Sequence, residues 1–279
     1  MEREQISPIP NVRIEPRRSL IALDIAEVWR YRELLYFLAW RDVKIKYKQT
    51  LIGIAWALLQ PALTTLIFSL IFSTWVRMDT GTIPYPLFAL SGLMVWLFTF
   101  STVTFASNSF VGHANLVTKV YFPRLIVPAA ATIAGLFDLV FSLLMLAGMM
   151  LFYRTGVGAQ LLLAPVFLLL AVIQTAAFGT LLSALNVRFR DVRFALPFLL
   201  QIWMIASPVF YPASMVPERF RLLFAVNPMV GILDGFRSAL FDLSFDWQLI
   251  GVSVTSIIVI SVVSLFVFAR MEDDFADQI

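Results

Sequence analysis

The sequence predicts an all-α membrane protein with six transmembrane helices, an N-terminal amphipathic interface helix, and re-entrant helices between spans five and six. Two observations lead to this fold class. The 279 residues are 60% hydrophobic and only 14% charged, whereas soluble domains are about 45–50% apolar and about 25% charged. The apolar residues also fall into long runs without charge. This composition excludes a soluble enzyme, a disordered chain and a collagen-like chain.

Six charge-poor runs are long enough to be spans, because a helix needs about 20 apolar residues to cross about 30 Å of hydrocarbon. One run contains a single acid, Asp138, and the others contain no charged residue. The expected spans are 51–76, 86–110, 125–152, 161–185, 194–210 and 248–269.

The stretch 211–247, between the last two spans, mixes polar and apolar pieces. Each apolar piece is too short to cross a bilayer. These pieces suit re-entrant or interfacial helices, and a small extracytoplasmic loop is the alternative.

An even number of spans places both termini on the same side. The N-terminal segment, the loops after spans two and four, and the C terminus hold 16 Lys and Arg, and the other side holds five. Positive residues favour the cytoplasmic side, so both termini are expected in the cytoplasm. The pI of 9.3 then reflects topology and not nucleic-acid binding. No signal peptide is recognisable, so span one is expected to direct insertion.

The segment 24–50 has a helical pattern, with aliphatic and aromatic residues at three- and four-residue spacing and most charges on the other side. Trp, Tyr, Lys and Arg together are typical of a helix in the headgroup layer. This helix is either a simple membrane anchor or a lever that also touches a cytoplasmic partner. Three regions follow: a tail with this helix at 1–50, a transmembrane domain at 51–270 and a cytoplasmic tail at 271–279.

The chain has few residues suited to catalysis. It contains no Cys and one His, His113, which excludes disulfides, thiolate chemistry and multi-histidine zinc sites. Neither a G-x-x-x-x-G-K-[ST] nor a G-x-S-x-G motif is present, so we expect no catalytic residue and no metal ligand. The intramembrane Asp138 is either a transport residue or a structural, hydrogen-bonded or protonated group. Energy for uphill transport would come from another subunit.

Two loops on the expected cytoplasmic side, 112–124 and 186–193, combine charged and aromatic residues. Such loops suit a partner interface, and plain positively charged connectors are the alternative.

Four stretches, in this order, resemble membrane permease subunits of ABC exporters for polysaccharides, the branch that carries O-antigen, capsule and teichoic-acid polymers. The stretches are LIGIAWALLQP at 51–61, LVTKVYFPR at 116–124, NVRFRDVR at 186–193, and NPM through FR at 227–237. With their spacing they cover about residues 24–270.

The resemblance implies a homodimer in the bacterial cytoplasmic (inner) membrane, working with two copies of a separate cytoplasmic ABC ATPase. ATP and Mg²⁺ would bind in that partner, and this chain would hold no cofactor. The resemblance matches 112–124 to a coupling helix, the amphipathic segment to an interface helix, and 211–247 to re-entrant helices on the extracytoplasmic side. The expected ATPase contacts are Asn115, Lys119, Tyr121, Phe122, Arg124, Arg190 and Asp191.

A sugar polymer presents hydroxyl groups and apolar C–H faces, so polar and aromatic side chains can bind it and still let it slide. Spans one and five carry such residues, although each aromatic ring could instead face lipid or fill the core. The expected path residues are Gln60, Thr64, Phe68, Phe72, Trp75, Gln201, Trp203, Phe210 and Tyr211.

We therefore expect the permease subunit of an ATP-driven exporter of lipid-linked, O-antigen-like polysaccharide, and not an enzyme. Teichoic acid, capsule or another amphiphile is the alternative cargo. A membrane-embedded glycan-modifying enzyme is the alternative of another class, and it is disfavoured because no second acid faces Asp138.

Overall fold

The computed structural model describes residues 25–48, 53, 55–113, 116, 119–156, 158–272 and 275, and all regular secondary structure within them is helical. Five helices in this part of the chain are long and apolar enough to cross a membrane. They are α3 (Ala55–Ser69) continued by η1 (Leu70–Trp75), α4 (Tyr85–Ser107), α7 (Ile126–Phe152), η2 (Ala159–Leu163) continued by α8 (Ala164–Arg188), and α12 (Trp247–Met271). The chain is therefore a multi-pass membrane protein, as predicted.

The expected fifth span forms a shorter helix than predicted. It is α9 (Val192–Ile205), whose 14 residues extend about 21 Å at 1.5 Å per residue, less than the roughly 30 Å of a hydrocarbon core. The helix ends before Pro208, whose nitrogen cannot donate a helical hydrogen bond. Helix length alone therefore does not confirm the predicted six spans.

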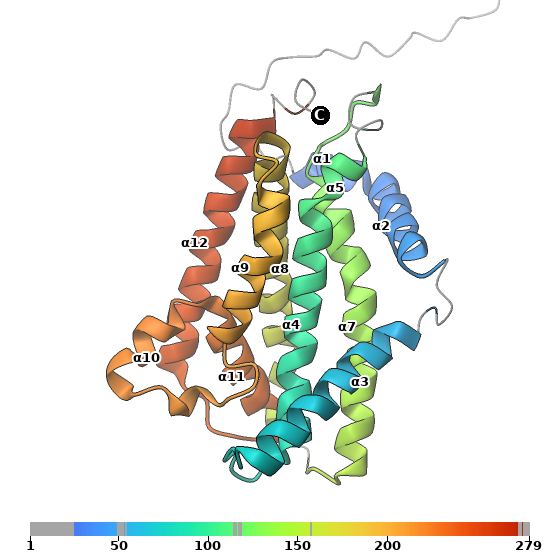
Figure 1. The fold of residues 1–279 in the computed structure, drawn as a ribbon. Coiled ribbons are helices and arrows are strands. Elements are labelled where there is room, and N and C mark those ends of the chain that lie inside the picture. Colours follow the sequence, from blue (N-terminus) through green and yellow to red (C-terminus); the bar gives the residue numbers. More distant parts are fainter. Residues whose placement is uncertain are drawn as a thin grey trace, which may run out of the picture.

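Short helices occupy the stretch for which re-entrant or interfacial pieces are predicted. They are η3 (Ala213–Met215), α10 (Glu218–Ala225) and α11 (Pro228–Phe241). The side chain of Asn227 caps α11 by accepting a hydrogen bond from the Met229 N–H at 3.1 Å. α11 is almost wholly buried and packs against α8 and α12. Figure 1 shows α10 and α11 in the lower half of the bundle.

α4 lies at the centre of the bundle and contacts α3, α7, α8, α9 and α11 (Figure 1). It is mostly buried, whereas α3 with η1 is largely exposed. Glycines let its neighbours approach closely. A Cβ on Gly135 would lie 2.0 Å from the Thr102 hydroxyl oxygen, and one on Gly92 would lie 2.4 Å from the Arg237 guanidinium. The other helices are therefore arranged around a fixed central element.

The N-terminal segment forms α1 (Ile25–Arg30) and α2 (Arg32–Tyr47), which agrees with the helix predicted over 24–50. α2 packs along α7. The rings of Tyr36 and Trp40 are exposed, where a helix in the headgroup layer would present them to lipid. The buried residues of α2 are Leu38, Ala39, Asp42 and Val43.

The bundle has two ends, which we call the basic end and the opposite end (Figure 1). The basic end holds α5 (Ser109–Gly112), residues 119–125, the turn at 189–191 and the last turn of α12. The opposite end holds residues 76–84, 153–156 and 242–246. The two loops predicted to share a side therefore lie at the same end. A hydrogen bond of 2.8 Å from the Asn186 side chain to the Ser107 carbonyl helps to join them.

Candidate functional site

Aromatic and charged side chains project from the basic end. Tyr121 is 75% exposed and Phe189 is 53% exposed. Lys119, Arg190 and Asp191 are exposed on the same two loops. Exposed rings among charged groups are typical anchors of protein–protein contacts. These five side chains thus lie at the same end of the bundle, on two loops that a partner could contact together.

Two other predicted contact residues support the first of these loops from within. Phe122 is 4% exposed. The Arg124 N–H donates to the Glu272 carboxylate at 3.3 Å, and the Arg124 guanidinium lies 5.8 Å from the centroid of the Phe275 ring. In this conformation both residues hold the loop in place instead of projecting from it. The remaining predicted contact, Asn115, lies outside the described residues.

A buried cluster lies beneath these loops and joins α2, α5, α7, α8 and α12 with Phe275. Within it, the Phe110 ring lies 4.9 Å from the Phe275 ring and 6.1 Å from the Phe268 ring, measured between centroids. Close-packed interiors are hardly compressible and transmit strain. We call residues 112–124 the projecting loop. A force on the projecting loop would therefore reach the ends of several long helices.

Asp42 of α2 is a buried acid that the sequence analysis did not single out. Its Oδ1 lies 3.0 Å from the Arg41 guanidinium and 3.7 Å from His113 Nε2. Burial raises the pKa of Asp42 above its ordinary value, and His113 and Arg41 oppose this shift. The group links α2 to the start of the projecting loop. The only signal available in the sequence was that Asp42 stands next to Val43, an apolar residue of the predicted amphipathic helix.

Asp138, the intramembrane acid, accepts hydrogen bonds from Lys46 Nζ and from the Tyr47 hydroxyl, both at the end of α2. This geometry favours the structural alternative, in which the carboxylate anchors α2 on α7. A small pocket of about 220 Å³ next to these groups is also lined by Gln60 and Ser142. Span one therefore begins beside the anchor of α2.

Three predicted path residues stack on one another. The ring of Phe68 lies 3.7 Å from that of Phe210, with 8° between their planes. Phe72 lies 6.4 Å from Phe210 and 5.9 Å from Tyr85. Phe72 belongs to η1, a π-helical turn of a kind frequent at functional sites. This ring stack joins the end of span one to the connector after α9.

Five other predicted path residues, on span one, on α9 and after α9, are not part of the ring stack. Gln60, Trp75 and Gln201 are exposed, and Trp75 is 81% exposed. The Thr64 hydroxyl donates to the Gln60 carbonyl at 2.8 Å. The Tyr211 hydroxyl donates to a backbone carbonyl at the end of α9 at 3.0 Å. The exposed Gln60 and Gln201 amides do not enclose a path within one chain, so they could line a path only if another surface, such as a second copy of the chain, lay opposite them.

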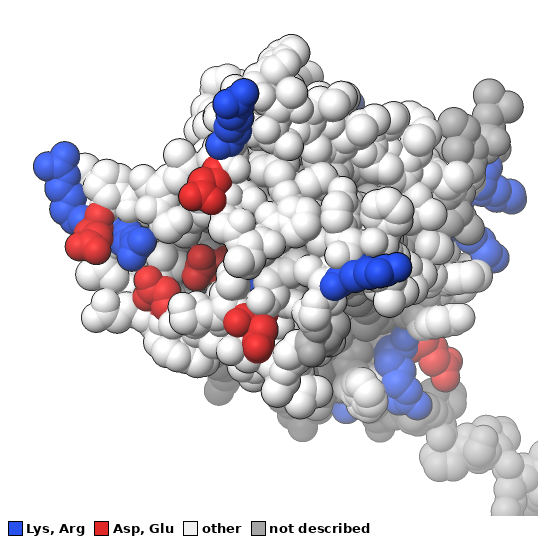
Figure 2. Space-filling view, turned by 90° about the horizontal axis from the view of Figure 1, so that it is seen from below, with Lys and Arg blue, Asp and Glu red and all other residues white. Residues whose placement is uncertain are grey.

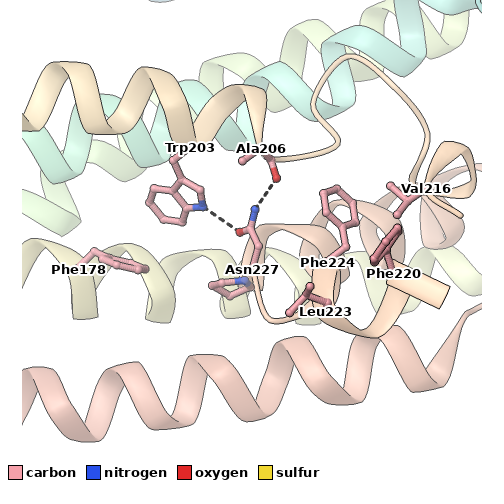
Figure 3. Close-up of a pocket in the computed structure, with 9 residues that line it drawn as sticks. Phe178, Trp203, Ala206, Val216, Phe220, Leu223, Phe224 and Asn227 are labelled. Carbon is pink, nitrogen blue, oxygen red and sulfur yellow. Dashed lines mark hydrogen bonds between the residues drawn. The ribbon is translucent and has the colours of Figure 1, made fainter. Parts of the chain in front are cut away.

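Trp203 lines an apolar pocket of about 460 Å³ between α8, α9, α10 and α11 (Figure 3). The side chain of Asn227 at its edge is fully engaged, because its amide donates to the Ala206 carbonyl at 2.9 Å and its oxygen accepts from the Trp203 indole at 2.8 Å. The pocket rings belong to Phe178, Trp203, Phe220 and Phe224. Such a surface suits hydrocarbon better than sugar.

Arg237 of α11 is a buried cation that fixes the connector after α9. Its guanidinium donates to the carbonyls of Pro208 at 2.6 Å, Val209 at 2.7 Å and Phe88 at 3.1 Å. It also lies 3.6 Å from the centroid of the Phe88 ring. Because Phe210 directly follows these carbonyls, Arg237 sets the position of the ring stack. No role was predicted for Arg237, although a base in a mostly apolar segment is a usable signal.

Among the described residues, no group of three or more His, Asp or Glu side chains could hold a metal ion. The arrangement offers a contact surface at one end, and rings and amides along two helices. These features suit passage and coupling better than acid–base catalysis.

Comparison with known proteins matches residues 33–241 to the family described as ABC-2 type transporter. The chain is 28% identical over 259 residues to the O-antigen export system permease protein RfbA of Myxococcus xanthus, covering 91% of this chain and 98% of that protein. It is 25% identical over 246 residues to the protein of the same name from Klebsiella pneumoniae, covering 88% and 94%. The polysialic acid transport protein KpsM of Escherichia coli is 25% identical over 233 residues, covering 81% and 87%. Because the family match extends from α2 to the end of α11, this chain belongs to the ABC-2 type transporter family.

Proposed function

We propose that this chain is the membrane permease of an ATP-driven exporter that moves lipid-linked, O-antigen-like polysaccharide across the bacterial cytoplasmic membrane. Similarity to an O-antigen export permease over 91% of this chain carries the proposal. The membrane bundle, the rings and amides on α3 and α9, and the projecting loop at the basic end support it.

In this proposal the chain receives energy and does not hydrolyse ATP. A separate cytoplasmic ABC ATPase binds ATP and Mg²⁺, and two copies of it contact the basic end of two permease chains. Tyr121 and Lys119 make one contact, and Arg190 and Asp191 make another. Motion of the ATPase pushes on the projecting loop, and the buried cluster beneath passes the displacement to α7, α8 and α12.

Two copies of this chain would form the conduit. α3 with η1 is long and apolar but little buried within one chain, and the Gln60 and Gln201 amides are exposed. Amides facing lipid are unfavourable, which favours a second copy and the polymer against these faces. Amides exchange hydrogen bonds with sugar hydroxyls, and rings contact C–H faces, so the polymer can bind and still move.

The basic end would face the cytoplasm together with both termini, because Lys and Arg concentrate on that side. α9 and α11 would share the fifth of the six crossings. The Asn227 amide at the start of α11 donates to the Ala206 carbonyl at the end of α9 at 2.9 Å, so the two short helices meet at these ends and in this proposal would do so within the membrane. Discontinuous helices of this kind occur in other transporters. α10 would lie on the extracytoplasmic side.

Capsule polymer is the second candidate cargo. The polysialic acid transport protein KpsM is 25% identical to this chain over 233 residues, which favours an acidic capsule as the alternative to O-antigen. Sugar analysis of the exported polymer separates the two.

The proposal is tested by deleting the gene in its host and quantifying surface polysaccharide. We expect surface polymer to disappear, lipid-linked polymer to accumulate inside, and a plasmid copy to reverse both changes. A tagged chain should co-purify with an ABC ATPase. Normal surface polymer without an accumulated intermediate would overturn the assignment to polysaccharide export.

A further inference from the structure

A pocket of about 540 Å³ lies at the opposite end of the bundle. It shares no lining residue with the apolar pocket of Figure 3. η3, α10, α11 and the turn that leads into α12 enclose it. Figure 2 shows this end from below, where most acidic side chains lie on one part of the face and the basic side chains are more widely spread. The chemistry of the pocket rests on Arg221, Asp234, Phe245, Asp246, Trp247 and Gln248.

The pocket collects hydrogen-bonding groups that the described part of the chain leaves unused. Arg221 Nε is buried and has no hydrogen-bond partner. Within the described residues, neither the Asp234 carboxylate nor the Gln248 amide makes a hydrogen bond. Asp246 uses one oxygen to accept from the Leu249 N–H at 3.1 Å. Only Arg221 Nε is a buried atom of this set, whereas Asp234 and Asp246 are half-buried and Gln248 is exposed. A buried donor is usually paired, so a ligand with hydroxyl groups would pair Arg221 Nε and exchange hydrogen bonds with the other three side chains.

Trp247 adds a flat aromatic face at the rim. Its side chain is 65% exposed, and its ring lies 5.0 Å from that of Phe245. Phe245 in turn stacks on Phe167 at 5.9 Å, which fixes the position of the tryptophan. A Trp at the end of a span is often only an interfacial anchor. Here it borders unpaired polar groups, and this combination of one apolar face with convergent donors and acceptors fits a sugar ring.

The charge of the pocket indicates which sugars would bind. Asp234 and Asp246 carry two negative charges when ionised, and Arg221 carries one positive charge. Arg237 also acts electrostatically on Asp234, but it is buried and does not line the pocket. A phosphate or carboxylate group that enters the pocket meets the two lining carboxylates directly and is repelled, whereas neutral hydroxyl groups meet both donors and acceptors.

We propose that this pocket, named the Trp247 pocket, binds a short uncharged segment of saccharide. One sugar ring lies against Trp247, and its hydroxyl groups pair with Asp234 and Arg221. Its place as a receiving site for exported polymer rests on the proposed function, in which the opposite end faces outward. In that place it favours neutral over acidic polymers.

The test uses the full-length chain in lipid nanodiscs, without an ATPase, on an array of three probe classes. These are neutral bacterial oligosaccharides, uronic-acid oligosaccharides and glycerol-phosphate oligomers. We expect the neutral class to bind, and the two acidic classes to bind about tenfold more weakly or not at all. Trp247→Ala should weaken neutral binding about tenfold, whereas Trp247→Phe should retain most of it. Phe152→Ala, at a ring that is 80% exposed at the same end, is the matched control and should bind like the parent.

The proposal is overturned if no probe binds, if acidic probes bind as well as neutral ones, or if Trp247→Ala binds like the parent. The array involves no transport, so its result is independent of the export test. If the chain binds neutral saccharides in this pocket but deletion of its gene leaves surface polymer unchanged, the pocket proposal stands and the export proposal fails.

Discussion

The guanidinium of Arg237 donates to the carbonyl of Val209 at 2.7 Å and thereby ties α11 to the connector after α9. The same group also engages the carbonyls of Pro208 and Phe88. Inside a bilayer no water can replace such a donor. The position of the connector, and of the ring stack that begins with Phe210, therefore depends on one side chain.

Replacing Arg237 with Met should lower the free energy of unfolding by about 3 kcal/mol or more, because three carbonyls lose their donor together. Arg237→Lys keeps the charge but lacks the planar fork, so an intermediate loss is expected. Thermal unfolding in detergent measures both. Arg219→Ala, whose exposed guanidinium lies 4.6 Å from the Phe220 ring, should change little. Equal melting temperatures for Arg237→Met and the parent would contradict this role.

Tyr121 and Phe122 are neighbours with different expected roles. Tyr121→Ala removes an exposed ring, so stability should be unchanged while export and polymer-stimulated ATP hydrolysis fall. Phe122→Ala removes a buried ring and should lower the free energy of unfolding by about 3–5 kcal/mol. Melting temperature and reconstituted turnover separate the two effects, with Phe152→Ala as the exposed control at the opposite end. Full coupled turnover by Tyr121→Ala would rule out the proposed contact.

Asp42 provides a prediction about pH. Because burial raises its pKa above the ordinary value of 3.8, the folded protein favours the protonated carboxyl. The protonated Asp42 carboxyl therefore stabilises the fold fully at pH values below the pKa of Asp42 in the unfolded chain. This stabilisation is lost as the pH rises through the pKa of Asp42 in the folded chain. Asp42→Asn should therefore melt at or above the temperature of the parent at neutral pH, and this advantage should shrink as the pH is lowered.

Melting curves of the parent and Asp42→Asn between about pH 4 and pH 8 check this sign. Asp191→Asn, at an exposed position, serves as the control for a general effect of removing an acid. If Asp42→Asn is clearly less stable at neutral pH, then the pairing with Arg41 and His113 outweighs the effect of burial.

The long spans could be predicted because the bilayer imposes charge-free runs of a minimum length. The run 86–110 became α4, at Tyr85–Ser107, and 248–269 became α12, at Trp247–Met271. The run 194–210 was equally apolar, yet α9 stops at Ile205. Hydropathy does not register the missing N–H of Pro208, nor a distant arginine that pairs the carbonyls left free after the helix.

The candidate site could be predicted only where residues are close in sequence. Helical spacing placed Phe68 and Phe72 on one stripe of span one. Their contact with Phe210 depends on how the connector folds back, which no local pattern contains. The pairing of Asp138 with Lys46 depends in the same way on how α2 packs along α7. A lone charge in an apolar segment signals that a partner exists but does not identify it.

The contact between Lys46 and Asp138 spans 92 residues and joins α2 to α7, and variants at Asp138 can distinguish an anchor from a transport residue. Lys46 is 40% exposed at its side chain, so solvent limits the coupling energy of a double-mutant cycle to about 1 kcal/mol. Asp138→Ala removes the acceptor and should increase hydrogen exchange in α2. Asp138→Asn can still accept hydrogen bonds from Lys46 and Tyr47, so α2 should stay protected from exchange and export should stay near normal. Lys44→Ala, at a side chain 5.5 Å from the Trp40 ring, is the control. If Asp138→Asn abolishes export while α2 stays protected, the carboxylate acts in transport itself, because its charge and not its anchoring contact would then be required.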